Sequence, residues 1–280
     1  MIEFKKFDNG FEYIEVKNKI SSAKISLQGA HLFSFKIDEN ELLWVSEASN
    51  FKYKESIRGG IPICWPSFGM SKTNPNLPQH GFARTSMWEL TDSEDKDEVT
   101  TLNFKLKQTN KNLKLFNYKF ELTYTIIISK DLTLQLNTKN NDNKAFKITQ
   151  ALHTYFDISN ILDIKISGLD KKPYLDALDK KQKIQIDDLL IDKEVDRVFQ
   201  EINNTITLHD KTKTIDINNQ GSSSLVVWNP WYEKCSKMSA MNNDSFKTMV
   251  CIESANAFED EVEIQANKSH TLEAKITLSK

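Results

Sequence analysis

Apolar and polar residues alternate with a period of two along much of the chain. The longest run begins at Tyr118, and from there to Ile128 every second residue is apolar while most of the residues between are polar. After the polar segment 129–131 the alternation resumes at Leu132. Because alternate side chains of a strand point to opposite faces of its sheet, this run predicts a long β-hairpin with one buried face.

The same alternation recurs in shorter segments, at 33–37, 215–217 and 272–278, with turns rich in Asn, Asp and Lys between them. Helical periodicity is limited to "PWYEKCSKM" and "DRVFQEI", each long enough for one or two turns. No linker rich in Pro, Gly or Ser divides the chain. We therefore expect an all-β protein with a single domain over residues 1–280, built as a large antiparallel β-sandwich.

Composition and charge narrow the classes of partner. Hydrophobic residues make up 39% of the 280 residues and charged residues 27%, which is typical of a globular chain with a sizeable core. The formal net charge of −2 argues against nucleic acid or an anionic membrane as the main partner. The N-terminal segment lacks the apolar core of a signal peptide, and no apolar run approaches the ~18 residues of a membrane span.

The three cysteines, Cys64, Cys235 and Cys251, are widely spaced, and no C-x-x-C motif is present. This pattern is typical of a reducing compartment, so we expect a cytoplasmic protein. Cys64 and Cys251 lie among apolar residues, which indicates that they pack in the core and do not act as nucleophiles.

Arginine is rare in this lysine-rich chain. Of the 37 basic residues only Arg58, Arg84 and Arg197 are arginine, and two of these flank the stiff segment that begins "RGGIPICWPSFG". A guanidinium grips a phosphate or carboxylate with two parallel hydrogen bonds, which lysine cannot do. A structural ion pair, or stacking on Trp65 or Trp88, explains the composition equally well. The G-K-[ST] of a nucleotide-binding loop is missing, so an anion bound here would be a phosphate carried by a substrate.

Two histidines lie in contexts that suggest chemistry. His80 occurs in "LPQHGFAR", where no strand alternation directs it inward, and His153 occurs in the strand-like "TQALHTYFD". A lone histidine is most often structural, although its charge can change near neutral pH. No two histidines have the spacing of a local metal site such as H-x-x-x-H, so we expect no metal.

Two acids also need an explanation. Glu253 follows an apolar run, and the alternation there places it on the same face as Cys251 and opposite Ile252. A carboxylate at the end of a buried strand is unfavourable unless it is paired, used or able to reach solvent. Asp196 is adjacent to Arg197 and could simply pair with it.

Seven segments occur in the order found in one enzyme family: "QGAHLFSF", "RGGIPICWPSFG", "LPQHGFAR", "ALHTYF", "VDRVF", "WNPW" and "VCIESAN". The chain thereby resembles the hexose-6-phosphate mutarotases (glucose-6-phosphate 1-epimerases) of the aldose 1-epimerase superfamily, from about residue 28 to residue 256. The resemblance implies a galactose mutarotase-like β-sandwich. It also implies an isomerase that interconverts the α and β anomers of an aldose.

The resemblance assigns roles to individual residues. Glu253 matches the general base that takes the proton of the anomeric hydroxyl, and His153 matches the general acid that protonates the ring oxygen. His80 matches a histidine close to the ring oxygen and hydroxyls. Asp196 matches a carboxylate that orients either the sugar hydroxyls or the acid histidine.

Further matches concern the substrate and its phosphate. Arg58, Gln79 and Arg84 match substrate-binding positions of the phosphate-specific branch. Where the family often has an acid, this chain has Ala240, to which we assign no role. Anomer exchange needs an acid and a base on opposite sides of one C–O bond, and it needs no redox step or metal.

The expected partner is a small sugar phosphate, with glucose 6-phosphate as the first candidate. We expect no cofactor, and we expect the enzyme to be a monomer. Two alternatives remain open at this point. One is a mutarotase of free aldoses, which would not need the arginine pair. The other is a non-catalytic carbohydrate-binding protein on the same sandwich, which would not need both His153 and Glu253.

Overall fold

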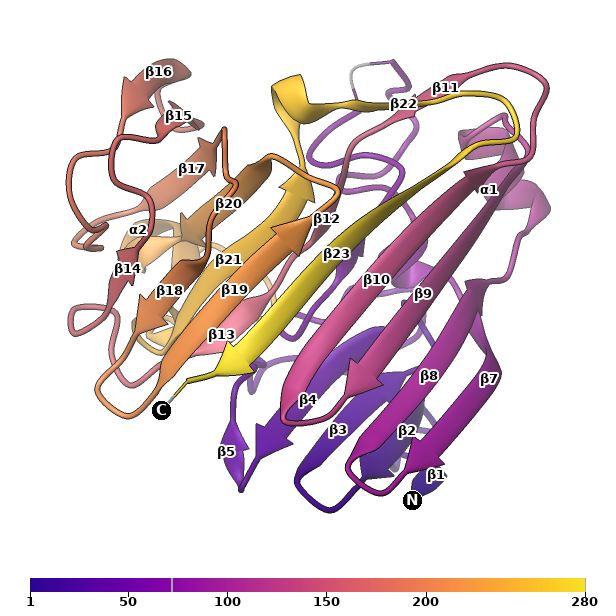
Figure 1. Cartoon of the computed structure of the whole chain (residues 1–280), viewed down its shortest axis with the longest axis horizontal. Coiled ribbons are helices and arrows are strands. Elements are labelled where there is room, and N and C mark those ends of the chain that lie inside the picture. Colours follow the sequence, from indigo (N-terminus) through magenta and orange to yellow (C-terminus); the bar gives the residue numbers. More distant parts are fainter. Residues whose placement is uncertain (72, 280) are drawn as a thin grey trace.

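The computed structural model describes residues 1–71 and 73–279, and the strands of this part form three large antiparallel sheets and one small one. The first large sheet is N-terminal and lies at the lower edge of Figure 1, in indigo. Its strands, in spatial order, are β1 (Ile2–Lys6), β2 (Glu12–Lys17), β3 (Ser21–Ser26), β4 (His31–Ile37) and β5 (Asn40–Glu41).

The second sheet has eight strands and contains the predicted hairpin. Its spatial order is β14 (Lys165–Ser167), β18 (Ile206–His209), β19 (Thr214–Gln220), β23 (Ser269–Leu278), β10 (Asp131–Asn140), β9 (Phe120–Ile128), β8 (Val99–Leu106) and β7 (Trp88–Lys96). β9 pairs with β10 in the register Ile128↔Leu132, and strict alternation buries every second residue of β9. The prediction of a hairpin with one buried face is therefore confirmed.

The third sheet also has eight strands. Seven follow the order β16 (Lys181–Ile184), β15 (Pro173–Asp176), β17 (Val195–Phe199), β20 (Ser224–Asn229), β21 (Met249–Asn256), β12 (Gln150–Leu152) and β6 (Ile63–Cys64). The eighth strand, β13 (Tyr155–Asp157), also pairs with β21. β21 is buried along its whole length, because both of its faces are covered.

The remaining elements are short. β11 (Phe146–Ile148) pairs with β22 (Val262–Ile264), and the helices are α1 (Asn110–Leu115), α2 (Trp231–Cys235) and three 3₁₀ turns at Ala83–Thr85, Ser245–Lys247 and Phe258–Asp260. α2 lies within the predicted "PWYEKCSKM". The helical prediction for "DRVFQEI" was wrong, because its first residues belong to β17 and pair with both β15 and β20.

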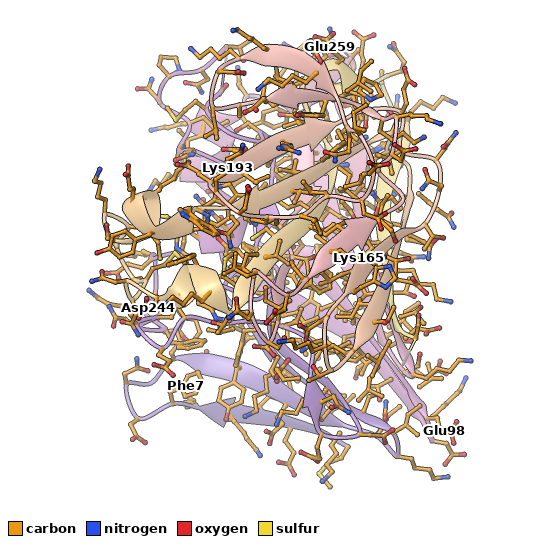
Figure 2. The ribbon with its side chains drawn as sticks, turned by 90° about the vertical axis from the view of Figure 1, so that its left-hand side faces the viewer. Phe7, Glu98, Lys165, Lys193, Asp244 and Glu259 are labelled. Carbon is orange, nitrogen blue, oxygen red and sulfur yellow. The ribbon has the colours of Figure 1, made fainter. Side chains whose placement is uncertain are left out.

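A continuous apolar core joins the three large sheets. It gathers buried residues from each of them, among them Phe35 of β4, Tyr124 of β9 and Ile252 of β21. Figure 2, turned by 90°, shows the N-terminal sheet near Phe7 at one end of the molecule and the turn at Glu259 at the other. The fold is thus the expected large antiparallel β-sandwich, with the third sheet supplying a face on which side chains converge.

No helix in the described part of the chain combines the length and the apolar character that crossing a bilayer requires.

Candidate active site

A pocket of about 760 Å³ lies over the third sheet. It contains all seven residues that the sequence singled out for substrate or catalysis: Arg58, Gln79, His80, Arg84, His153, Asp196 and Glu253. Three of these come from β17, β21 and the β12–β13 junction, and four come from loops that precede β6 or β7. The fold therefore brings together residues that are almost two hundred positions apart in the chain.

Glu253 and His153 meet because two short strands register on one long strand. β12 pairs with β21 through Leu152↔Ser254, and β13 pairs with it through Tyr155↔Cys251, so His153 lies beside Glu253. The Nδ1 atom of His153 is 3.4 Å from Oε1 of Glu253. The two residues are only 8% and 1% exposed. Ile252 belongs to the main core and Glu253 lines the pocket, so the two lie on opposite faces as the alternation predicts.

The protonation of this pair follows from its burial. Burial raises the pKa of Glu253 well above its usual value, and the nearby Asp196 carboxylate raises it further. Burial lowers the pKa of His153 well below its usual value, and His80 and the two pocket arginines act in the same direction. The pair therefore favours the state in which neither group is charged and the carboxyl holds the single proton.

Each member of the pair also has a polar atom that finds no partner in the described part of the chain. Nδ1 of His153 and Oε2 of Glu253 are buried and make no hydrogen bond to any residue that the structure describes. An unpaired buried polar atom costs about 1–3 kcal/mol, and most such atoms in folded proteins are satisfied. This arrangement is typical of groups held ready for a ligand or for proton transfer.

His80 is oriented as a neutral hydrogen-bond donor. Its backbone has φ 63°, and its Nδ1 accepts a hydrogen bond of 3.1 Å from the backbone N–H of Gly69. In the neutral ring the proton is therefore on Nε2. Burial lowers the pKa of His80 to about 3, so the ring stays neutral at physiological pH. The centroid of its ring is 5.8 Å from that of His153.

Among the residues that the structure describes, the two pocket arginines have no carboxylate partner. Arg58 donates a 3.4 Å hydrogen bond to the hydroxyl of Tyr155, and Arg84 donates a 2.8 Å hydrogen bond to the carbonyl of Gln79. Among the described residues neither guanidinium forms an ion pair, and neither stacks on an aromatic ring. Arg197 differs, because within the described part of the chain it stacks on the ring of Tyr174 and donates a hydrogen bond to Gln185.

Two consecutive glycines position Arg58. Gly59 has φ 113° and Gly60 has φ 63°, and a Cβ atom on Gly59 would lie 2.4 Å from the carbonyl oxygen of Trp44. The buried ring of His31 holds the same turn, with its Nε2 2.8 Å from the Gly59 carbonyl oxygen. Only glycine allows this close approach of two backbones, which explains why "RGG" precedes β6.

Asp196 lies on β17 and does not pair with Arg197. Its carboxylate is 4.0 Å from the ammonium of Lys234, and burial raises its pKa. In the described residues no hydrogen bond joins it to His153, so the geometry favours contact with a ligand in the pocket over orientation of that histidine.

The sequence did not identify three lining residues as functional. Tyr155 stacks on His153 with centroids 4.8 Å apart and ring planes 6° from parallel. Trp228, which composition favours as core, lines the pocket edge-on to the same histidine. Lys234 of α2 reaches the pocket and binds Glu194. Tyr155 could have been found, because it is two residues from His153 and alternation places both on one face.

Ala240, to which the sequence assigned no role, lies on the pocket lining with φ 56°.

Possible metal ligands are also present, in a group that histidine spacing does not reveal. His153, Cys251 and Glu253 are all buried, and their ligand atoms lie within 4.8 Å of one another. The sequence could not indicate this group, since its members lie about a hundred residues apart and meet only through strand pairing.

The family model for aldose 1-epimerase matches residues 12–277 of the chain. Two relatives carry the same name, "Putative glucose-6-phosphate 1-epimerase". The protein from Cenchrus ciliaris is 34% identical over 268 residues, covering 90% of this chain and 80% of its own length. The protein from Escherichia coli K12 is 32% identical over 264 residues, covering 92% of this chain and 88% of its own.

A solved structure supports the same grouping. The structure of the Salmonella typhimurium protein YeaD carries the description "putative mutarotase". It superposes on this chain with a TM-score of 0.92 at 31% identity, and the match covers 100% of this chain and 94% of the YeaD chain. The match of the family model to nearly the whole length, the identity to the relatives and the superposition agree with one another. The chain belongs to the aldose 1-epimerase family, and it is an isomerase of that type.

Proposed function

We propose that this protein interconverts the α and β anomers of a hexose 6-phosphate, with Glu253 and His153 as the base and the acid. The observation that carries the proposal is their contact, 3.4 Å between Nδ1 and Oε1, in a pocket that also holds two arginines for which the described residues supply no carboxylate partner. The names of the relatives from Cenchrus ciliaris and Escherichia coli K12 support the phosphorylated substrate.

The reaction needs one proton to be exchanged at each of two oxygen atoms. Glu253 as carboxylate takes the proton of the C1 hydroxyl, while protonated His153 gives its proton to the ring oxygen. The C1–O5 bond breaks, and the aldehyde carbon rotates about its bond to C2. Closure on the other face returns both protons, so the enzyme ends in its starting state.

The buried pair supplies the active form without any proton from solvent. Carboxylic acid with neutral imidazole, and carboxylate with imidazolium, hold the same total number of protons. Transfer of one proton across the 3.4 Å gap converts the first form into the second. A bound sugar favours the second form, because its hydroxyls replace the water that burial removed from the charged groups.

The remaining pocket residues define the substrate. Neutral His80 presents its Nε2–H to a sugar oxygen, and Asp196 accepts from a hydroxyl. Arg58 and Arg84 offer two planar forks of donors, which suit the three oxygens of a phosphate and have no equivalent partner in a free sugar.

The test is the rate of anomer exchange, measured by NMR saturation transfer or polarimetry on glucose 6-phosphate and on free glucose and galactose. We expect enzyme-dependent exchange of the phosphorylated sugar, with kcat/KM reduced about tenfold to 100-fold in Arg58→Met and in Arg84→Met. Exposed Lys268→Met is the matched control and leaves the rate unchanged. Exchange of free sugars alone would show that the phosphate assignment is wrong, and binding without exchange of any sugar would leave a carbohydrate-binding protein.

A further inference from the structure

Beneath the sugar pocket, Cys251 shares a face of β21 with Glu253. Its side chain is fully buried, and no hydrogen bond to its sulfur is found in the described residues. The thiol, the carboxylate and the imidazole of His153 come within 4.8 Å of one another, and the last two border the pocket. The proposed anomer exchange uses the imidazole and the carboxylate but gives the thiol no task.

The three side chains match the ligand preferences of one kind of ion. Zn²⁺ accepts a thiolate, an imidazole nitrogen and a carboxylate oxygen, and three such ligands with one position left open are typical of its accessible sites. Zn–N and Zn–O bonds of about 2.0–2.1 Å imply a tetrahedral N···O edge of about 3.3 Å. The observed distance between Nδ1 of His153 and Oε1 of Glu253 is 3.4 Å.

Independent observations show that two of the ligands are available. Nδ1 of His153 and Oε2 of Glu253 have no hydrogen-bond partner among the described residues, although the two residues are 8% and 1% exposed. A buried lone pair without a donor is unfavourable, and a cation bound to Nδ1 relieves that of the imidazole. Oε1 is the carboxylate oxygen that faces Nδ1, and a cation held by both carboxylate oxygens relieves Oε2 as well. Tyr155 and Trp228, packed around the imidazole, limit its movement.

We propose that His153, Cys251 and Glu253 form a binding site for Zn²⁺ or a similar thiophilic cation, which inhibits the enzyme. The inhibitory part rests on the proposed function. A metal ion held there occupies the nitrogen and the oxygen that must exchange protons with the sugar. Its fourth position points to the pocket, so sugar phosphate and metal exclude each other. Cys251 thereby makes the acid–base pair sensitive to free zinc.

The first experiment measures binding without any sugar. Chelator-treated protein is titrated with Zn²⁺ by calorimetry and with Co²⁺ by near-ultraviolet absorption, where a thiolate-to-cobalt charge-transfer band reports a Co–S bond. We expect one equivalent to bind with the band present. Cys251→Ala and Cys251→Ser lose the band and weaken Zn²⁺ binding by at least the about tenfold to 100-fold that loss of a residue supporting a metal ligand costs. Cys235→Ala, which removes a buried thiol from α2, keeps both.

The second experiment measures anomer exchange of glucose 6-phosphate as Zn²⁺ is added. We expect inhibition of the wild type and of Cys235→Ala that is competitive with the sugar. In the two Cys251 variants we expect a similar rate without metal and about tenfold weaker inhibition.

The outcomes separate the two proposals. A Co–S band without exchange of any sugar leaves the metal site and removes the proposed function together with the inhibition. Exchange without saturable metal binding removes the metal site alone. Equal Zn²⁺ affinity in the wild type and the Cys251 variants, or acceleration by Zn²⁺, also overturns it.

Discussion

At the scale of single residues, burial decides the protonation of Glu253 and His153. In water, a carboxyl of usual pKa 4.5 and an imidazole of usual pKa 6.5 would carry opposite charges between those two values. In this pocket burial raises the first pKa and lowers the second, so the neutral pair is favoured until a substrate arrives. The two groups therefore hold one proton between them over a wider pH range in this pocket than they would in water.

Removal of either member of the pair tests its role directly. We expect His153→Ala and Glu253→Gln each to lower kcat for anomer exchange about 10²–10⁴-fold, because each substitution stops one of the two proton transfers. His209→Ala, which removes a histidine hydrogen-bonded to Ser167 outside the pocket, is the matched control. Circular dichroism establishes that all three variants are folded. Turnover at the wild-type rate in both pocket variants would contradict the acid–base assignment.

The raised pKa of Glu253 also predicts how stability depends on pH. The unfolded chain ionises this carboxyl above about pH 4.5, whereas burial keeps it protonated in the folded state. The folded wild type therefore loses stability relative to Glu253→Gln as the pH rises from 4.5 towards the raised pKa, and the difference is constant below 4.5.

Urea unfolding at a series of pH values measures this difference. Glu98→Gln, at an exposed turn, serves as the control and follows the wild type at each pH. A Glu253→Gln variant whose advantage shrinks as the pH rises would show that the carboxyl is ionised in the folded protein.

At the scale of elements, the Arg58 turn is a test of close backbone packing. A methyl group at Gly59 would meet the Trp44 carbonyl at 2.4 Å, whereas Gly10, also at positive φ, has nothing within 4 Å of the added atom. We expect Gly10→Ala to lower the free energy of unfolding by about 1 kcal/mol from backbone strain alone. Gly59→Ala should lose at least about 2 kcal/mol more and raise KM for the sugar phosphate, because Arg58 is displaced. Equal losses in urea unfolding would contradict this account.

For each element, the sequence predicted the features that depend on residues close to one another in the chain. The β9–β10 hairpin was predictable because its alternation continues across a short turn. The same alternation predicted that Ile252 and Glu253 point to opposite faces of their strand. "DRVFQEI" was misassigned because a short apolar run fits either period, and pairing with β15 and β20 decides it as a strand.

At the scale of the whole molecule, a slightly acidic protein holds two of its three arginines in one pocket. The formal net charge is −2, yet Arg58 and Arg84 lie in the pocket without carboxylate partners among the described residues. We expect kcat/KM for glucose 6-phosphate to fall severalfold as the salt concentration rises from about 10 mM to about 150 mM, because ions screen the attraction. Stopped-flow or NMR exchange experiments measure kcat/KM at each salt concentration. Any activity on free glucose serves as the control and stays constant, and an equal response of both sugars would contradict steering by the arginines.

The site as a whole was predictable only through the resemblance. Local patterns singled out Arg58, His80 and Glu253 one by one, but their convergence depends on strand pairings between distant segments. Cys251 shows the limit most clearly: from its neighbours it is a packing residue, and only the register of β13 on β21 places it against His153.

One consequence follows from how β21 is flanked. Main-chain hydrogen bonds to β20 on one side and to β12 and β13 on the other hold Glu253 and its imidazole partner at a set spacing. The pocket residues Arg58 and His80 lie, in contrast, on loops, and Arg84 lies on a short 3₁₀ turn between strands. Such connecting segments tolerate changes of length and composition. Changes in these loops can thus alter what the pocket accepts without altering the spacing of Glu253 and His153.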